Sequence, residues 1–402
     1  MQGTAGIAYL RACALLLVML VLAGCSSLPR TQFSAQDQGA AQIPGMPGAR
    51  FWADSSAEEL RIAMHLKPLQ AHARQVGAMN MLALSGGAAD GAFGAGVLTG
   101  MSAAGKRPHF AFVSGVSAGA LIAPLAFLGP DYDKVLTDAF TDGRAASLGD
   151  GGVFSLLFSA EQRRSALYDL VASIVDERMV AAVAAEHARG RRLVVVTTNL
   201  DAQRPVVWDL GLIASSRHPD AVKLFRDVLV ASASIPGAFA PTLIEVQAGG
   251  KTFSELHVDG GASTQVFTVP ESLIASGGVG PAAAGAVPAR FYILMNNRLT
   301  PDFEVVQGSA LPVLGRSLAS LIKTHARLTL VATQEFARTQ GIGFSLTYIG
   351  DDFPREPESS FETSYMRSVY AYGYRKATAG KLWETSIPFP TPAGRQLQIS
   401  RR

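Results

Sequence analysis

The chain has 402 residues, of which 48% are apolar and 17% are charged, and its formal net charge is +3. This composition excludes a disordered chain, and the near balance of charge argues against nucleic acid as a partner. No repeat of the length found in solenoids is visible, so we expect a globular protein with a large buried core.

The N-terminal segment has the pattern of a secretory signal. Arg11 precedes an apolar run over residues 12–22 that is too short for a permanent membrane span. The run ends in LAGC at 22–25, which resembles the lipobox of bacterial lipoproteins, in which small residues admit a peptidase and the cysteine thiol receives the lipid. An ordinary secretory signal that is cleaved elsewhere is the alternative. We expect residues 1–24 to be removed and Cys25 to be lipidated.

The cysteines support this expectation. The chain has only two, and Cys13 lies in the segment that we expect to be removed. With Cys25 lipidated, no thiol is left for a disulfide, a metal site or a catalytic cysteine. Ser26 follows Cys25, whereas an Asp there would, by resemblance to Gram-negative lipoproteins, favour the inner membrane. The sequence therefore predicts a lipid-anchored protein of the cell envelope, on the outer membrane facing the periplasm rather than on the inner membrane.

The rest of the chain divides into three parts. Residues 25–56, rich in Gln, Ala, Gly and Pro up to about Arg50, are predicted to be the lipidated N-terminus and a flexible tether. Residues 57–390 are predicted to form one α/β domain, and residues 391–402 a surface tail. The domain is expected to begin with a helix over 57–75, in which Leu60, Met64 and Leu69 fall near helical spacing.

Strand-length apolar runs then alternate with helices. Buried strands are predicted at 79–84, 110–114, 193–197 and 290–295, and helices at 118–128 and 159–188, where Ser159 and Gln162 have capping-box spacing. Small and turn-forming residues predict loops at 141–152 and 277–288. This alternation indicates a mainly parallel sheet that is covered by helices on both faces.

A G-x-S-x-G motif lies between the second strand and the helix that follows it. Gly115 and Gly119 flank Ser117, and this strand-turn-helix context is what a nucleophile elbow requires. The turn is strained, and the glycines leave room for the serine to project into a cleft. The sequence therefore predicts Ser117 as a nucleophile, with a glycine-rich turn before a helix as the alternative.

A second glycine-rich turn, SGGAADGA at 85–92, follows the first strand. Its backbone amides, at the start of a helix that is expected to run to about Ala104, could stabilise an oxyanion. A dinucleotide or phosphate loop is the alternative, but neither G-x-G-x-x-G after the strand nor G-x-x-x-x-G-K-[ST] is present.

A Ser-His-Asp triad would need a well-placed histidine, and the chain has seven histidines to consider as the base. His257 is the one near a plausible loop, in the sequence LHVDGG at 256–261, and it could assist as a neighbour on the same strand face. A polar strand residue is the alternative interpretation of His257. The Asp-Gly-Gly turn exposes Asp259, which makes Asp259 the better candidate for the base.

Several of these segments resemble patatin-like phospholipases. The segments are LSGGAADGAFGAGVL (84–98), GVSAG (115–119) and DGG (259–261), and TTNLDAQRPVVWDL (197–210) and ASASIPGAFAPT (231–242) agree. The resemblance covers most of residues 79–295. It implies a three-layer α/β/α fold with a mainly parallel central sheet, and a Ser-Asp dyad that acts without histidine.

By motif position, the resemblance assigns the nucleophile to Ser117 and the base to Asp259. It assigns the oxyanion loop to Gly86, Gly87 and Ala88, and the Asp-Gly-Gly turn to Gly260 and Gly261. Two positions depart from the family pattern: Ala88 replaces a third glycine, and Asp90 replaces Arg or Lys. We expect the Asp90 side chain to cap the following helix.

The resemblance implies a lipid acyl hydrolase of the phospholipase A or lysophospholipase type that cleaves carboxylic esters through an acyl-enzyme. It implies neither a cofactor nor a metal. The expected substrate is a phospholipid or another acyl ester. The apolar loop at 153–158 could contact the bilayer or line the acyl pocket, with packing on the core as the alternative. The alternatives are a short-chain carboxylesterase or thioesterase with the same dyad, and a non-catalytic lipid-binding envelope lipoprotein. An aspartate with an ordinary pKa of about 3.9 is a weak base at neutral pH, so either burial has to raise this pKa or the oxyanion hole has to supply more of the catalysis.

Overall fold

A computed structural model describes residues 30–148, 160–277, 287–301, 303, 305–354 and 361–389. The predicted signal segment, Cys25, Ser159, the 153–158 loop and the 391–402 tail lie outside the described residues. Within the described ranges, every helix is either too short or too polar to span a bilayer.

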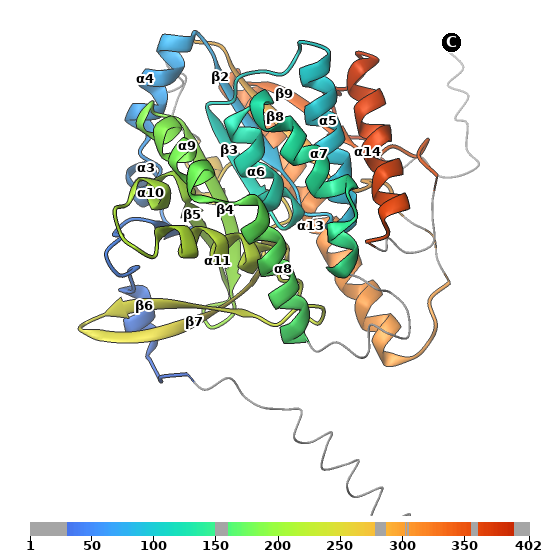
Figure 1. Ribbon diagram of the computed structural model, residues 1–402. Helices are drawn as coiled ribbons and strands as arrows, with labels where there is room; N and C mark the ends of the chain where they lie inside the picture. Colours follow the sequence, from blue (N-terminus) through green and yellow to red (C-terminus); the bar gives the residue numbers. More distant parts are fainter. Residues whose placement is uncertain are drawn as a thin grey trace, which may run out of the picture.

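A nine-stranded sheet forms the centre of the molecule (Figure 1). Five neighbouring strands, in the order β4-β3-β2-β8-β9, run parallel, and β5, β1 and β7 extend the sheet with antiparallel pairs. The strands are β1 (Arg50–Trp52), β2 (Met79–Leu84), β3 (Phe112–Val116), β4 (Arg192–Asn199), β5 (Arg204–Asp209), β6 (Thr242–Ala248), β7 (Lys251–Asp259), β8 (Ala289–Met295) and β9 (Gly343–Tyr348). The predicted mixed α/β fold with a mainly parallel central sheet is confirmed.

Helices cover both faces of the sheet. Leu84 and Val195 point to the face covered by α5 (Gly91–Ala103), α6 (Ala118–Leu128) and α11 (Ala221–Ala233). Val196 and Ile293 point to the opposite face, covered by α4 (Leu66–Val76) and α13 (Ala310–Gln340). The remaining helices are α2 (Ala35–Gly39), α3 (Ala57–Ala63), α7 (Asp133–Thr141), α8 (Ala160–Ile174), α9 (Glu177–Ala188), α10 (Leu210–Ser215), α12 (Glu271–Ala275) and α14 (Thr363–Thr378), with short 3₁₀ turns at Ala88–Asp90, Pro130–Tyr132, Arg144–Leu148 and Gly260–Ala262.

Two predicted helices are each divided in two. The helix expected over 57–75 breaks between α3 and α4, where His65 has a φ of 45°. Pro68 explains the break, because a proline is tolerated in the first turn of a helix but not in its interior. The helix expected over 159–188 ends at Ile174, and Asp176 caps α9 by accepting a hydrogen bond from the Met179 amide.

The predicted tether is too long. Residues 38–52 belong to the domain, since β1 pairs with β5 and the Gln38 side chain donates a hydrogen bond to Asn199 at 3.0 Å. The Arg50 guanidinium is buried and forms an ion pair with Glu255. Polar and small residues in this segment therefore reflect local turns and buried hydrogen bonds rather than flexibility.

Helix α5 lies against α14 at very short range. A Cβ added at Gly96 would lie 2.0 Å from the Tyr370 carbonyl oxygen, and one added at Gly373 would lie 2.4 Å from the Phe93 carbonyl oxygen. Only glycine permits this backbone approach. The contact fixes α5, whose N-terminus follows the glycine-rich turn after β2.

Candidate active site

Ser117 occupies the sharp turn between β3 and α6. Its φ of 55° and ψ of −125° lie outside the regions that L-residues favour, as expected for a strained nucleophile elbow. The neighbouring backbones pack closely, because a Cβ at Gly115 would lie 2.4 Å from the Gly119 carbonyl oxygen and one at Gly119 would lie 2.4 Å from the Leu84 carbonyl oxygen. These contacts require both glycines of the motif.

Asp259 is the last residue of β7 and comes to the same edge of the sheet. β7 pairs with β4, with Thr197 opposite Asp259, and β4 lies beside β3, which ends at the elbow. Ser117 and Asp259 are both only 5% exposed. The Ser117 hydroxyl lies close enough to the Asp259 carboxylate to lower its pKa, so the structure places the two predicted residues side by side.

The electrostatic setting of Asp259 suits a base. Burial raises its pKa to about 7, against the opposing effects of the Ser117 hydroxyl and the Gly261 amide. Oδ1 accepts a hydrogen bond from that amide at 2.6 Å, whereas Oδ2 accepts none of standard geometry from the described residues. A carboxylate with one occupied and one open oxygen is oriented and still able to accept a proton.

The glycines of the Asp-Gly-Gly turn are also set by close packing. A Cβ at Gly260 would lie 2.4 Å from the Val196 carbonyl oxygen, and one at Gly261 would lie 3.0 Å from Asp259 Oδ1. The turn therefore presses against β4 while it presents the Gly261 amide to the carboxylate.

The glycine-rich turn after β2 lies beside the nucleophile, since a Cβ at Gly86 would lie 3.1 Å from Ser117 Cβ. The prediction that Gly86 supplies an oxyanion donor is wrong, because its amide donates to the Gln265 carbonyl oxygen at 3.0 Å. The amides of Gly87 and Ala88 have no acceptor among the described residues and remain candidates. At Gly87 a Cβ would lie 2.0 Å from the Asn296 carbonyl oxygen.

The two departures in this turn have different structural outcomes. Ala88 adopts a φ of 48°, a conformation that a third glycine would adopt at lower cost. Asp90 occupies the N-cap position of α5 but makes no side-chain cap, contrary to expectation. Its Oδ1 instead accepts a hydrogen bond at 2.6 Å from the hydroxyl of Tyr365 on α14. The carboxylate is thus turned toward α14.

An apolar cavity lies next to the turns that contain Gly87 and Ser117. Its volume is about 40 Å³, and its wall includes Ala88 and Ala118, whereas neither Ser117 nor Asp259 lines it. Further in, the wall is formed by Leu121, Leu170, Val171 and Leu229 from three helices. An apolar slot that begins beside Ser117 suits an acyl chain.

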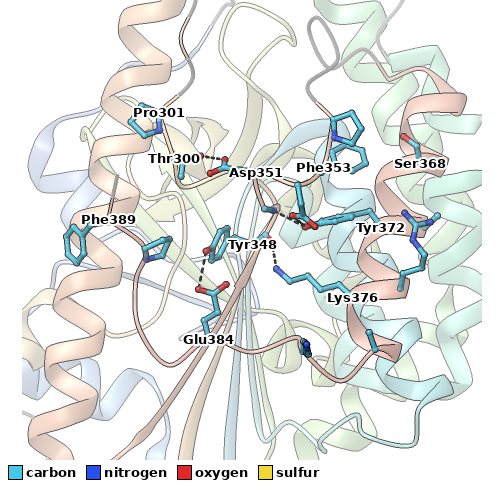
Figure 2. A pocket seen from close by; sticks show the side chains of 18 residues that line it. Thr300, Pro301, Tyr348, Asp351, Phe353, Ser368, Tyr372, Lys376, Glu384 and Phe389 are labelled. Carbon is cyan, nitrogen blue, oxygen red and sulfur yellow. Dashed lines mark hydrogen bonds between the residues drawn. The ribbon is translucent and has the colours of Figure 1, made fainter. Parts of the chain in front are cut away.

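A larger cavity of about 1220 Å³ lies elsewhere, between the end of β9 and α14 (Figure 2). Neither Ser117 nor Asp259 lines it. Its polar side chains bond within the wall, since Tyr372 donates to Asp352 at 2.6 Å and Lys376 donates to the Tyr348 carbonyl oxygen at 3.0 Å.

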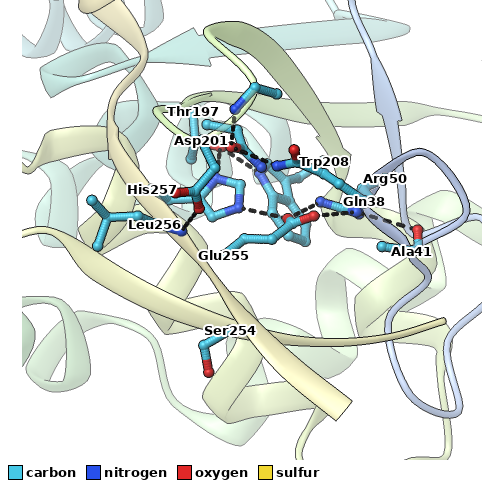
Figure 3. Close-up of polar contacts among 12 residues, drawn as sticks. Gln38, Ala41, Arg50, Thr197, Asp201, Trp208, Ser254, Glu255, Leu256 and His257 are labelled. Atoms are coloured by element: carbon cyan, nitrogen blue, oxygen red, sulfur yellow. Dashed lines mark hydrogen bonds and ion pairs between the residues drawn. The ribbon is translucent and has the colours of Figure 1, made fainter. Parts of the chain in front are cut away.

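His257 is fully buried in a polar cluster, in which its ring nitrogens face Thr197 and Glu255 and not Ser117 (Figure 3). Its Nδ1 lies 2.9 Å from Thr197 Oγ1, which also accepts a hydrogen bond from the Trp208 indole at 2.8 Å. Its Nε2 lies 3.1 Å from Glu255, the partner of Arg50. The polar strand residue was the correct interpretation.

Three further residues support the site and were not predicted. Ser232 accepts a hydrogen bond from the Ser117 amide at 3.0 Å and donates to the Val196 carbonyl oxygen at 2.7 Å. The Asn296 side chain donates to Ser85 at 2.8 Å and accepts from the Gly94 amide at 3.0 Å. Gln265 holds Gly86. Asn296 directly follows β8, so the rule that sites lie at the carboxyl ends of parallel strands could have identified it.

No group of three His, Cys, Asp or Glu side chains that could hold a metal occurs within the described ranges. The site combines a strained serine, a buried carboxylate with a raised pKa, two open amides and an apolar slot. These are the parts that nucleophilic acyl transfer needs.

Comparisons with known proteins bear on the same region. A family model described as patatin-like phospholipase matches residues 82–269. The crystal structure of VipD from Legionella pneumophila is similar over 75% of this chain and 67% of that chain, with 11% sequence identity and a TM-score of 0.35. At this level the structural similarity carries no functional information. No curated protein sequence matches the chain.

Proposed function

We propose that the chain, whose residues 82–269 match a family model described as patatin-like phospholipase, hydrolyses acyl esters of lipids with Ser117 as nucleophile and Asp259 as base. The observation that supports this proposal most is the buried Asp259 carboxylate, with its raised pKa and open Oδ2, beside the Ser117 hydroxyl.

In the first half-reaction, Ser117 Oγ attacks the ester carbonyl carbon while Asp259 accepts the hydroxyl proton. The Gly87 and Ala88 amides stabilise the negative oxygen of the tetrahedral intermediate. The intermediate then collapses, Asp259 returns the proton to the leaving alcohol, and the acyl-enzyme remains. In the second half-reaction Asp259 takes a proton from water as the water attacks the acyl-enzyme. The intermediate then collapses, Asp259 gives the proton to Ser117 Oγ, and the carboxylic acid leaves.

The apolar slot supports an acyl substrate, and its size favours a second candidate. A volume of about 40 Å³ accommodates only a few methylene groups in this conformation, which suits a short-chain ester or thioester. The two candidates share the same dyad and differ in chain length. Leu170→Ala, which widens the slot, is expected to move the optimum on a panel of acyl esters toward longer chains.

We also propose that Cys25 anchors the protein by lipid, at the outer membrane facing the periplasm. Arg30, the first described residue, forms an ion pair with Asp201 at 2.6 Å, and Asp201 follows the carboxyl end of β4. The chain thus enters the domain at the edge that carries Ser117. Metabolic incorporation of a palmitate analogue tests the anchor, and labelling that persists in Cys25→Ala would refute it.

The catalytic proposal is tested with a fluorophosphonate probe and with mass analysis of products from mixed phospholipids. Labelling and hydrolysis are expected for the native chain and for the control Ser276→Ala, and neither for Ser117→Ala. Absence of labelling in the native chain would favour a non-catalytic lipid-binding lipoprotein. Hydrolysis that survives in Ser117→Ala would remove the serine from the mechanism.

A further inference from the structure

Helix α13 presents apolar side chains to water along its outer face. Leu314, Leu318, Leu321 and Leu328 are 57%, 49%, 67% and 63% exposed. They follow a spacing of four, three and seven residues, which places them on one side of the helix, and the exposed His325 lies on the same side between Leu321 and Leu328. Nearby Phe303 is 88% exposed, so the apolar surface extends beyond the helix.

The first part of the helix projects from the body of the protein (Figure 1). Residues 312–315 and 317–321 are all exposed, whereas the contacts with the sheet come from later residues, Ala326, Leu330 and Ala337. An apolar helix end that projects into water is unfavourable unless something covers it.

The distribution of charge along the helix distinguishes a partner helix from a lipid phase as the group that covers the apolar face. The positions that flank the leucine stripe are Gly, Ser, Ile, Thr, Thr and Val (residues 315, 317, 322, 324, 329 and 331), so none is charged. A partner helix is normally selected by charges at these positions. A lipid phase needs no such pairing.

The cations lie on another side of the helix. Arg316, Lys323 and Arg327 are half-buried, and Lys323 and Arg327 donate to the carbonyl oxygens of Thr300 and Leu299 at 3.0 Å. No Asp or Glu occurs between residues 310 and 334. These cations lie opposite the leucine stripe, toward the side that packs on the protein. A cationic side opposite an apolar side is typical of helices that lie in the interface of a membrane with anionic lipids.

The projecting end lies at the edge of the sheet that carries the catalytic residues. Helix α13 connects β8 to β9 along the chain. These two strands pair in parallel, so the N-terminus of the helix lies at the edge of the sheet where β8 ends. Asn296, directly after β8, bonds to Ser85 in the turn beside Ser117. We propose that the outer face of the N-terminal half of α13 inserts into the surface of an anionic bilayer and turns the active-site edge toward the lipid.

This proposal does not depend on catalysis by Ser117 or on a lipid at Cys25. It is tested in the full chain with Cys13→Ser and Cys25→Ser, in which Ser317→Cys carries an environment-sensitive fluorophore. Ser317 lies among the exposed leucines, and its hydroxyl donates a hydrogen bond to the Val313 carbonyl oxygen one turn earlier. A label at Ile62→Cys, where the native side chain is 69% exposed, serves as the control.

With vesicles of phosphatidylcholine and phosphatidylglycerol, the emission at 317 is expected to shift to shorter wavelength and to be quenched by lipids brominated on their acyl chains. The label at 62 is expected to stay in water. Replacement of Leu314, Leu318 and Leu321 by serine is expected to reduce quenching at 317 by about tenfold or more, since each leucine loses its transfer to the apolar phase.

Because the label reports its own position, binding of vesicles through the N-terminal apolar run does not imitate the expected result. A label at 317 that remains in water while the protein sediments with vesicles would overturn the proposal. Shielding of the label that rises with protein concentration, in the absence of vesicles, would also overturn it and would identify a second copy as the cover.

Discussion

Strand β7 carries two buried polar clusters that are built in opposite ways. At Glu255 and His257 the hydrogen bonds form a continuous series. Trp208 can only donate, so the Thr197 hydroxyl oxygen accepts from it. Burial lowers the pKa of His257 and favours the neutral ring, in which Nε2–H donates to Glu255 and Nδ1 accepts a hydrogen bond from the Thr197 hydroxyl. Burial works to raise the pKa of Glu255, but His257 and Arg50 lower it overall.

Asp259, two residues further on, has no cation beside it among the described residues. Burial raises its pKa, and one carboxylate oxygen is left without a hydrogen bond from the described residues. The first cluster satisfies its charges and holds β1, β4, β5 and β7 together. The second leaves a charge incompletely satisfied, and this gives a carboxylate that can exchange a proton near neutral pH. Burial alone does not distinguish a structural polar group from a reactive one, whereas the completeness of its bonding does.

The sharpest test is Asp259→Asn. The amide can still accept the Gly261 bond but cannot accept the serine proton, so kcat/KM for a soluble ester is expected to fall by about 10³-fold or more. Thermal unfolding is expected to be unchanged or to move upward, because a buried charge without a cation is removed. Steady-state kinetics and calorimetry on the same sample check both effects, and activity within tenfold of the native chain would contradict the assigned base.

Arg50→Ala should act on stability rather than on chemistry. It leaves the Glu255 charge buried without its cation, which is expected to cost about 3–5 kcal/mol in the free energy of unfolding. Arg204→Ala provides the control, since its partner Asp54 is 40% exposed and the pair is expected to contribute less than about 1 kcal/mol. Chemical denaturation measures both variants. Equal losses would show that the buried cluster is not specially stabilising.

The Asp259 carboxylate is expected to make both hydrolysis and the free energy of unfolding depend on pH. Because the folded pKa of Asp259 is about 7, above the unfolded value, hydrolysis is expected to decline by about tenfold per pH unit well below that value. The folded state holds this proton more tightly than the unfolded state, so stability relative to Asp259→Asn should rise as pH falls from 8 to about 5. Activity and stability thus change in opposite directions. A flat difference in unfolding midpoint across this range would argue against the raised pKa.

Ala88→Gly should have the smallest effect. It relieves a left-handed conformation at a φ of 48°, for an expected gain of up to about 1 kcal/mol in the free energy of unfolding. The neighbouring Ala89→Gly is the control, because Ala89 is fully buried without a positive φ and its replacement should destabilise by a similar amount. The same sign for both variants would contradict the strain at residue 88.

Local patterns were read correctly where neighbours along the chain decide the structure. The strand at 79–84 and the helix at 118–128 have the predicted bounds, because an apolar run and the elbow define them. Helix breaks at His65 and near Asp176 were missed, although Pro68 and the capping Asp176 signal them.

Contacts between distant residues could not be predicted. The Gly86 amide is occupied by Gln265, and Asp90 bonds to Tyr365, which lies 275 residues further along the chain. No periodicity or spacing encodes such contacts, because they depend on how elements meet in three dimensions. Proximity of Ser117 to Asp259 was expected from motif resemblance, and the geometry of the sheet supplies its physical cause.

The glycine contact between α5 and α14 bears on where the protein could be shortened. The region matched by the family model ends at residue 269, yet α14 spans Thr363–Thr378 and covers a helix inside that region. Removing α14 would expose the buried surface of α5, including Phe93, together with the helix that follows the turn beside Ser117. A chain that is truncated at residue 269, where the family match ends, is therefore expected to be insoluble. The domain that folds as a unit extends at least through residue 378.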